Sequence, residues 1–281
     1  MFSAHTTAAT GLAVAVGISI GFAQPKPNFE VASVRPNVSG STDSAIRPGL
    51  GDSSSATNAT VRMLILSAYR LHRTQLVGGP EWIDTERFDI TAKHPPGTTA
   101  SQIPLLWQSL LEERFKLNVR TERRPQPVYR LVLARKDGRL GPQLVRSPAD
   151  CAVADAVRLK GPVSIPAVGE RIPCNQRGSL MQDGQGIVSI AGRSMAALAE
   201  LLTLVAGQGR IVVDRTGLSG AFDAELRWHD EPMRGGTSGA PADERLSVFT
   251  AIQEQLGLRL ESGTEPVAVL VVEAVERPTP D

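Results

Sequence analysis

The alternation of apolar and polar side chains is clearest between Arg210 and Trp228. A β-branched run at 211–213 opens this stretch, and from Phe222 onward apolar positions alternate with charged ones. A period of two is typical of a half-buried strand. Residues 214–220 lie between the two parts and contain two glycines with Asp and Ser, which favour a turn. The pattern therefore predicts a β-hairpin here.

Similar patterns predict the other elements. Alternation indicates strands at 28–35, 87–93, 116–121, 128–135, 186–191, 258–261 and 267–275. Apolar residues at helical spacing indicate helices at 60–71, 101–115, 194–206 and 246–256. Thr60 and Ser194 are the expected N-caps of two of these helices, and Gly257 is the expected C-cap of the last. Polar, small residues at 37–58 and 229–245 predict loops, the first with room for a short strand.

Two stretches of the chain repeat one order of apolar positions. When Leu110 is placed on Ala251, 110–134 aligns with 251–275 without a gap, and Pro125 falls on Pro266. We call this register the proline alignment. It shares the apolar pattern, the element order and the turn prolines, and therefore predicts a tandem repeat. Because identities are few, chance similarity of two αββ units is the alternative.

A second register extends the repeat toward the N-terminus. In this aspartate alignment, Phe88-Asp89 is placed on Phe222-Asp223, and the helices that begin near 61 and 195 fall roughly opposite each other. The equivalence of Asp89 and Asp223 favours a structural role for both, in a turn or in cross-strand pairing with a basic neighbour.

The element order predicts an α+β fold of two tandem β-α-β-β-α-β-β lobes, which either pack together or share one sheet. Strands with one solvent-exposed face and helices with one apolar stripe bury their apolar surfaces best when the helices pack on one face of mixed or antiparallel sheets. The expected boundaries are 28–135 for the first lobe and 186–278 for the second. Residues 136–185 are Pro- and Gly-rich and are expected to form an irregular inter-lobe segment.

Length and composition narrow the class of partner. The chain has 281 residues, with 30 Lys and Arg against 29 Asp and Glu, so its net charge is close to zero. A balanced charge gives no support for a nucleic-acid partner or for an anionic membrane. Aromatic residues make up only 4% of the chain, too few for base-stacking platforms to be the first expectation.

The N-terminus is typical of an export signal. Residues 11–22 are uncharged and apolar, and small residues at Gly21 and Ala23 suit cleavage before Gln24. Residues 1–10 lack Lys and Arg, which export signals normally contain, so a retained anchor and a buried apolar segment are the alternatives. With 1–23 as signal peptide, the protein is expected to be periplasmic or secreted, without a membrane span after cleavage.

Cys151 and Cys174 are the two cysteines of the chain and lie in the predicted inter-lobe segment. In an exported protein an even pair predicts one disulfide. Closing a loop of this length stabilises the fold by about 3 kcal/mol in the chain-entropy model. Two unrelated thiols are the alternative.

Chemistry-bearing motifs are few. His72, His94 and His229 form no metal-ligand spacing, and each is expected at an exposed loop or helix end. Outside the predicted signal peptide no GxSxG motif occurs, and no SxxK site has supporting partners. We therefore expect no catalytic, metal-binding or cofactor-binding residues.

The remaining candidates have structural interpretations. The basic cluster at 120–124, with Arg130 and Arg135, favours a solvated sheet face over an anion site. Core packing is the expected role of the three tryptophans, which are Trp82, Trp107 and Trp228.

Five stretches of the chain follow a characteristic order. They are FEVASVRP, GGPEWIDTERFDITAKHP, LLEERFKLNVRTERRPQPVYRLVLARKDG, VVDRTGLSGAFDAELRW and FTAIQEQLGLRLESGTEPVAVLVVEAVERP. Together they resemble a paralogous family of uncharacterised secreted proteins that is abundant in soil acidobacteria, over most of residues 28–278. That family carries no established activity. Related domains beside sensor-type membrane metallopeptidases imply at most an extracytoplasmic sensing or binding role, and this chain has no HExxH motif.

A more distant similarity concerns each half of the chain. The form LAELLTLVAGQGRIVVD…GAFDAEL, followed by a second helix and hairpin, is similar to the short N-terminal domains of secretins and TonB-dependent receptors. Those domains bind partner proteins, so this resemblance implies protein binding without catalysis.

We therefore expect an exported, non-catalytic module that binds an unknown protein or peptide partner in the cell envelope. Strand addition at an exposed sheet edge is the expected route, because unpaired backbone groups invite a partner strand. The alternatives are a small-ligand sensor with a pocket between the lobes and a hydrolase without a known motif. A cleft that gathers two titratable side chains and a positioned His would favour the hydrolase.

Export makes a prediction about the mature chain. Protein recovered from the periplasm or medium of an expressing bacterium should begin at Gln24, because signal peptidase cleaves after a small residue. Intact-mass spectrometry with an alkylating reagent tests this and the disulfide together. The mature chain should take up reagent only after reduction, once per cysteine. A chain that keeps residues 1–23, or that is alkylated without reduction, contradicts the corresponding expectation.

Overall fold

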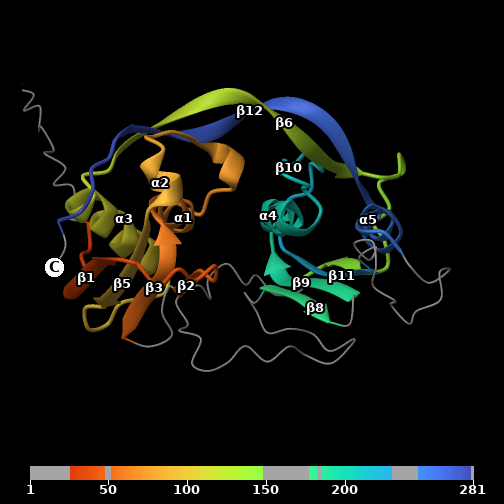
Figure 1. Cartoon of the computed structure of the whole chain (residues 1–281). Coiled ribbons are helices and arrows are strands. Elements are labelled where there is room, and N and C mark those ends of the chain that lie inside the picture. The colour runs from red at the N-terminus through yellow and green to blue at the C-terminus, as the bar shows by residue number, and fades with distance from the viewer. Residues whose placement is uncertain (1–25, 48–51, 148–176, 183–184, 230–245, 280–281) are drawn as a thin grey trace, which may run out of the picture.

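The computed structural model describes residues 26–47, 52–147, 177–182, 185–229 and 246–279. These residues form a mixed α+β structure of three four-stranded sheets and five α-helices, and most strand pairs are antiparallel. The predicted signal peptide and both cysteines lie outside the described residues. Figure 1 shows two bodies of helices and short strands joined by one long ribbon.

The three sheets are named here by their position. The first sheet has the order β1 (Val31–Pro36), β5 (Arg87–Lys93), β3 (Ser53–Thr60) and β2 (Ala45–Arg47). The second sheet has the order β7 (Leu144–Arg146), β11 (Phe222–His229), β9 (Gln185–Arg193) and β8 (Arg177–Gln182). The bridging sheet has the order β10 (Ile211–Asp214), β6 (Asn118–Leu133), β12 (Leu258–Ala274) and β4 (Leu76–Gly78).

Three helix ends lie where the predicted capping residues place them. The helices are α1 (Val61–Ala68), α2 (Trp82–Thr85), α3 (Ile103–Arg114), α4 (Met195–Val205) and α5 (Val248–Leu256), with a 3-10 turn η1 at Arg73–Gln75. The side chains of Thr60 and Ser194 each accept a bond from a backbone N–H in the first turn, at 3.3 Å. Gly257 ends α5 in the left-handed conformation at φ 68°, which glycine adopts without strain. The three predicted caps are confirmed.

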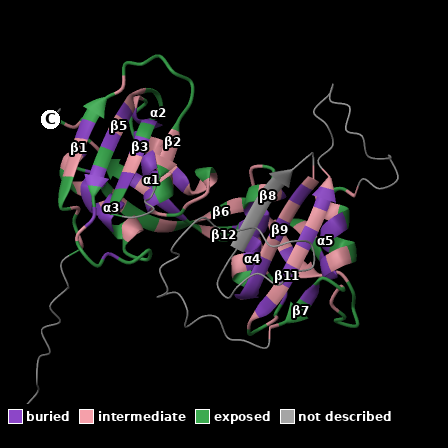
Figure 2. Cartoon of the chain, turned by 90° about the horizontal axis from the view of Figure 1, so that it is seen from below, coloured by how far each residue is buried: buried purple, intermediate pink, exposed green. Residues whose placement is uncertain are grey.

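The apolar side chains form two separate cores. The first core gathers the first sheet, α1 and α3, and it also contains Leu117 beside the start of β6 and Leu270 of β12. The second core gathers the second sheet, α4 and α5, and it contains Leu131 of β6 and Leu258 of β12. Figure 2 shows β6 and β12 passing from one body to the other. The opposite ends of one two-stranded ribbon therefore complete both cores.

The ribbon corrects the strand prediction. Turns were expected near the prolines that follow residue 121 and residue 261, but β6 and β12 each run through them as one strand. Pro125 lies directly opposite Pro266 in the antiparallel register. Because proline has no N–H, such a pair fits only where both N–H positions point away from the ladder. Among the described residues, no third strand pairs with this central part of the ribbon, so the missing donors leave no ladder bond unmade there.

The predicted hairpin over 210–228 is also wrong. β10 pairs in parallel with β6 in the bridging sheet, whereas β11 pairs with β9 and β7 in the second sheet. The turn between them changes the direction of the chain, because Asp214 accepts bonds from the N–H and hydroxyl of Thr216 instead of closing a tight hairpin. Periodicity identified both strands correctly but carried no information about their partners.

Two further predictions differ from the structure. The segment 136–185, expected to be irregular, contains β7 and β8, and the loop 37–58 contains both β2 and β3. Helices were expected on one face of each sheet, and each helix layer has in addition a second sheet on its other side (Figure 1). For example, α4 contacts β9 on one side and β10 on the other. The bridging sheet supplies the outer layer, and its strands come from both halves of the chain.

A β-bulge interrupts one strand pair in each outer sheet. Each bulge contains a residue in the left-handed conformation, Asn58 at φ 53° and Gly192 at φ 60°. An aspartate on the facing strand accepts a bond from that residue's N–H. Asp89 Oδ1 accepts from Asn58 and Asp223 Oδ1 accepts from Gly192, both at 2.8 Å. The two aspartates therefore have the structural role predicted for them, with a bulge amide as partner.

Removing either carboxylate should destabilise the fold. Asp89→Ala and Asp223→Ala each leave a bulge N–H without its acceptor, and we expect a loss of about 1–3 kcal/mol in the free energy of unfolding, measured by urea denaturation. The loss should be larger for Asp89, which also accepts from Asn37. Thr91→Ala, on the exposed face of β5, should change stability by less than about 0.5 kcal/mol. Equal, near-zero effects of all three substitutions would contradict this account.

Candidate functional site

The histidines occupy different environments. His72 lies at a helix start, where its ring accepts from Thr74 and caps η1. His94, expected to be exposed, is only 4% exposed, and its Nε2 lies 2.7 Å from the hydroxyl of Ser54, which is 1% exposed. The His94 ring also stacks on Phe29. Burial therefore corrects the prediction for His94, because the ring packs as a satisfied polar residue of the first core region.

The arginines predicted on a hairpin lie along β6 and are mostly paired. Arg120 and Arg124 both bond Glu122, and Arg120 also reaches Glu273 at 2.9 Å. These side chains are partly exposed. Because these arginines are paired with carboxylates and are partly solvated, they match the predicted solvated sheet face. They do not converge on a common point, as an anion site would require.

One carboxylate on the ribbon differs from the others. Glu265 is only 8% exposed, and it accepts from Arg130 at 2.8 Å and from Arg215 at 3.0 Å. The Arg215 guanidinium lowers the pKa of Glu265, Arg130 adds to this effect, and burial opposes it. Gly263 leaves room for the pair, since a Cβ there would lie 2.7 Å from Cζ of Arg130. The cluster links β10 to the ribbon.

A recess at one end of the first sheet is the best candidate for a binding site. Its volume is about 640 Å³, within the roughly 300–1,000 Å³ usual for ligand pockets. The recess is lined by Pro36, Asn37, Gly40, Ser41, Asn58, Thr85, Glu86, Arg87, Phe88, Arg277 and Pro278. These residues come from the end of β1, the loop after it, the β3 bulge, the start of β5 and the C-terminal segment.

One wall of the recess is the loop 37–44, which Asn58 holds. The side-chain amide of Asn58 donates to the carbonyls of Ser41 at 2.7 Å and Asp43 at 2.8 Å. Asn58 is 1% exposed and left-handed, a conformation that costs a non-glycine residue free energy. Asp89 accepts both from its backbone N–H and from the side chain of Asn37. The loop is therefore fixed by polar bonds to the bulge.

The opposite wall is formed by α2 and the C-terminal segment. Arg277 donates to both oxygens of Glu86, at 2.9 and 3.1 Å from Nε, and its guanidinium lies over the ring of Trp82 at 5.1 Å. The Trp82 ring is thus half-buried under an arginine, whereas Trp107 and Trp228 pack in the cores as predicted.

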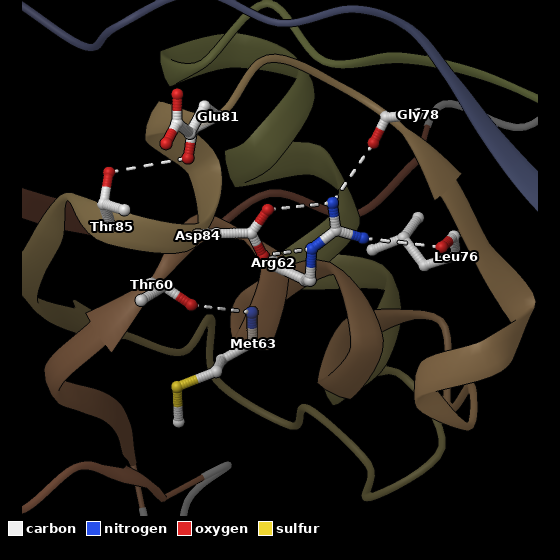
Figure 3. Close-up of polar contacts among 8 residues, drawn as sticks. All are labelled: Thr60, Arg62, Met63, Leu76, Gly78, Glu81, Asp84 and Thr85. Carbon is white, nitrogen blue, oxygen red and sulfur yellow. Dashed lines mark hydrogen bonds and ion pairs between the residues drawn. The ribbon is translucent and has the colours of Figure 1, made fainter. Parts of the chain in front are cut away.

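Figure 3 shows how α2 is attached to the rest of the first core. Arg62 of α1 bonds Asp84 of α2 and donates to the carbonyls of Leu76 and Gly78 in β4, at 3.4 and 3.2 Å. Inside α2, the hydroxyl of Thr85 donates to the carbonyl of Glu81. A single guanidinium thereby fixes α2 against α1 and β4, and with it one wall of the recess.

A second depression, of about 630 Å³, lies between α1, α3 and the bridging sheet. Burial and the nearby Glu112 raise the pKa of Tyr69 in its wall to about 12. Its floor includes Leu117 and Leu270, which already belong to the first core. The polar contacts of its lining are the ion pair of Lys26 with Glu112 and the bond from Gln108 to the carbonyl of Ala68. The recess is shaped by a larger connected network and is the stronger candidate.

The described residues contain neither a metal-ligand cluster nor a membrane-spanning helix. Among them no group of three or more His, Cys, Asp or Glu side chains is placed to hold a metal ion. No helix in the described part of the chain is long and apolar enough to cross a membrane.

The sequence analysis missed the recess residues. Asn37, Asn58, Arg87 and Arg277 lie far apart in the chain and match no motif. One signal was available, since the aspartate alignment, which places Phe88 on Phe222, also places Asn58 on Gly192. An asparagine at a position that suits glycine indicates a use for its side chain.

The fold and the recess define an α+β protein with two cores that share one ribbon and a preorganised polar recess on the first. A family model described as "Protein of unknown function (DUF3738)" matches residues 62–275, and the chain belongs to this family. No curated protein and no solved structure matches the chain. Membership of a family without an assigned function is thus confirmed, while the similarity to secretin and TonB-receptor domains stays a prediction.

The Glu265 cluster predicts a pH-dependent stability. Because the pKa of Glu265 is lower in the folded chain than the roughly 4.3 of an unfolded glutamate, its contribution is complete above about pH 5 and is lost as the pH falls through the folded value. At pH 7, Glu265→Gln should cost about 1–3 kcal/mol, and the difference from wild type should shrink as the pH falls below about 4. Denaturant unfolding across this range measures it.

The matched control is Glu261→Gln on the same strand. Glu261 is exposed and pairs with Arg259, so this change should cost less than about 1 kcal/mol. A Glu265→Gln penalty that does not change with pH would show that packing, not charge, explains the contribution of Glu265.

Proposed function

We propose that this chain is an extracytoplasmic, non-catalytic binding module and that the recess is its ligand site. The observation that carries the proposal is the polar network around Asn58. In this network a buried asparagine adopts a strained conformation, and its side chain holds a solvent-facing loop. Strain and buried polar bonds persist where function requires a preorganised surface.

We also infer that the two bodies are lobes produced by duplication of one α+β unit. The bulges support this, because the aspartate alignment relates Asn58 to Gly192 in the same register as Phe88 to Phe222. The ribbon supports it too, since Pro125 and Pro266, which the proline alignment relates, face each other in the ladder. This pairing is expected at the local two-fold axis of a tandem pair.

Strand exchange between the lobes follows the same symmetry. β4 from the first half pairs in parallel with β12, and β10 from the second half pairs in parallel with β6. Each lobe therefore receives its outer strand partner from the other half of the chain. A duplication that arose by fusing two strand-exchanged copies accounts for this arrangement.

Against this symmetric background, the recess is formed by the first lobe, and two of the features that shape it differ in the described part of the second lobe. The bulge of the second lobe uses Gly192, which has no side chain to hold a loop. In place of α2, the second lobe has the turn after Asp214. Features that one copy has and the other folds without are candidates for function, because folding of the unit does not require them.

The edges of the bridging sheet give less support to strand addition. The carbonyls of Leu76 and Gly78 in β4 already accept from Arg62, and the N–H of Val212 in β10 donates to the hydroxyl of Thr203. Prolines line the bare central part of the ribbon. Side chains that occupy edge groups, and prolines that lack a donor, both discourage a further strand. We therefore assign the recess, rather than these edges, to the partner.

The hydrolase alternative has one observation in its favour, the contact of Ser54 with His94. A nucleophile must reach its substrate, and both side chains are buried in the first lobe. The contact between Ser54 and His94 instead satisfies the buried polar groups of these two side chains. A small-ligand sensor stays compatible with the recess, and the size of the ligand separates it from a peptide-binding module.

Amide hydrogen exchange of the full chain tests the proposal. The protein is incubated with a bacterial envelope extract separated by mass into small-molecule, peptide and protein fractions. We expect one fraction to slow exchange in residues 37–44 by at least threefold, because a bound ligand shields the loop that forms the recess wall. A small-molecule fraction would favour the sensor, and a peptide or protein fraction the interaction module.

Two tryptophan variants localise the effect. Thr85→Trp fills the recess and should abolish the protection. Ser219→Trp, at the position that the aspartate alignment relates to Thr85, should keep it, since both serine and threonine are exposed and only Thr85 lines the recess. Protection that persists in Thr85→Trp, or that no fraction produces, would refute the recess as the ligand site.

A further inference from the structure

Building on the proposed recess function, we propose that the ligand presents a carboxylate beside an apolar group, and that Arg87 and Arg277 bind the carboxylate. Some hydrogen-bonding groups of the recess are already used within the chain, and others are left for a ligand.

The acceptors of the recess are used. Both oxygens of Asp89 accept from Asn37, and Oδ1 also accepts from the N–H of Asn58. Both oxygens of Glu86 accept from Arg277. The side-chain oxygen of Asn37 accepts from the N–H and hydroxyl of Ser39. Each of these oxygens, on side chains that line the recess or are bonded to its lining, already accepts from a donor of the chain, so they offer little to a ligand that needs acceptors.

Donors are left over on the two arginines. Arg87 uses Nη1, which donates to the hydroxyl of Ser44 and the carbonyl of Asn58, both at 2.9 Å. Arg277 uses Nε and Nη2 on Glu86. Within the described part of the chain, Nε and Nη2 of Arg87 and Nη1 of Arg277 have no partner. A ligand that complements this inventory is an acceptor, and a planar carboxylate matches the donor geometry of guanidinium groups.

The guanidinium of Arg277 is oriented before any ligand binds. The guanidinium donates to the carboxylate of Glu86, and its face lies over the ring of Trp82. An oriented donor loses little conformational entropy on binding. Glu86 also lines the recess and repels an anion, but Arg277 bonds it and matches its charge. Arg87 is then the positive charge in excess among the side chains that line the recess, since Asp89 does not line it.

The remaining surface of the recess is apolar. Phe88 forms buried floor, and Pro36 and Pro278 lie beside it. Val38, in the loop that Asn58 holds, is 94% exposed. The apolar lining of Phe88, Pro36 and Pro278 beside the two arginines suits a ligand with an apolar group close to its carboxylate. A C-terminal hydrophobic residue and an acidic side chain next to one both carry this chemistry.

Three defined peptides test the inference by ¹H–¹⁵N NMR titration of the full chain. They are N-acetyl-Ala-Leu with a free carboxylate, the same peptide as its C-terminal amide, and N-acetyl-Leu-Glu as its C-terminal amide. We expect the free acid to shift amide signals of residues 37–44 and to bind at least tenfold more tightly than its amide. The third peptide separates the sources. Binding like the free acid means that a side-chain carboxylate suffices, and binding like the neutral amide means that a chain terminus is required.

Arginine variants provide the second measurement. Arg277→Gln should weaken the free acid at least tenfold, and Arg277→Lys should restore little of this, because an ammonium lacks the planar fork. Arg135→Gln is the matched control, since Arg135 is similarly exposed and pairs with Asp137, and its effect should stay within twofold. The unliganded spectra outside the recess should be unchanged, which shows that each variant is folded.

The outcomes separate this inference from the proposed function. Equal affinity for the acid and its amide, or an Arg277→Gln variant that binds like wild type, would overturn the role of the carboxylate while leaving the recess as a ligand site. No shift at 37–44 with any of the three peptides would also overturn it. The exchange experiment with Thr85→Trp decides the proposed function separately, because it makes no assumption about ligand chemistry.

Discussion

The antiparallel pairing of β6 with β12 is the interaction on which the rest of the structure depends. One end of this ribbon contributes Leu270 to the first core, and the other contributes Leu131 to the second. Each core also takes its bridging-sheet strands from both halves of the chain. Neither half can bury its apolar residues with its own strands alone, so the hydrophobic stabilisation of both bodies requires the ribbon to form. Because its strands are far apart in the sequence, this pairing also closes a long loop of the chain.

Satisfying backbone groups at the sheet edges is the second constraint. The bridging sheet is wide at its two ends and only two strands wide in the middle, so it has several edges. Arg62 and Thr203 bond edge groups at the ends, and facing prolines remove donors from the middle. The same requirement explains the aspartates, which accept the N–H that each bulge removes from the ladder. Many of the distinctive polar residues are therefore explained by the backbone they satisfy, and they are poor guides to a ligand.

The recess is different because its polar bonds organise a surface instead of an edge. Asn58 could be glycine without loss of the bulge, as Gly192 shows. The side chain of Asn58 holds the loop 37–44, and this loop forms one wall of the recess. Sequence inspection placed Asp89 and Asp223 in a structural role, and it found the alignment that sets Asn58 against Gly192. It did not find the recess, whose arginines at 87 and 277 are brought together only when the C-terminal segment lies against α2.

Local pattern alone determined the helices, their caps at Thr60, Ser194 and Gly257, and the alternation of β11. These features depend on neighbours within a few residues, which a sequence displays directly. Tertiary structure decided which strands pair, that β10 and β11 enter different sheets, that prolines run inside long strands and that His94 is buried. Periodicity reports which face of a strand is covered. It does not report the partner that receives a strand's N–H and C=O groups, because in this chain that partner often lies in the other half of the sequence.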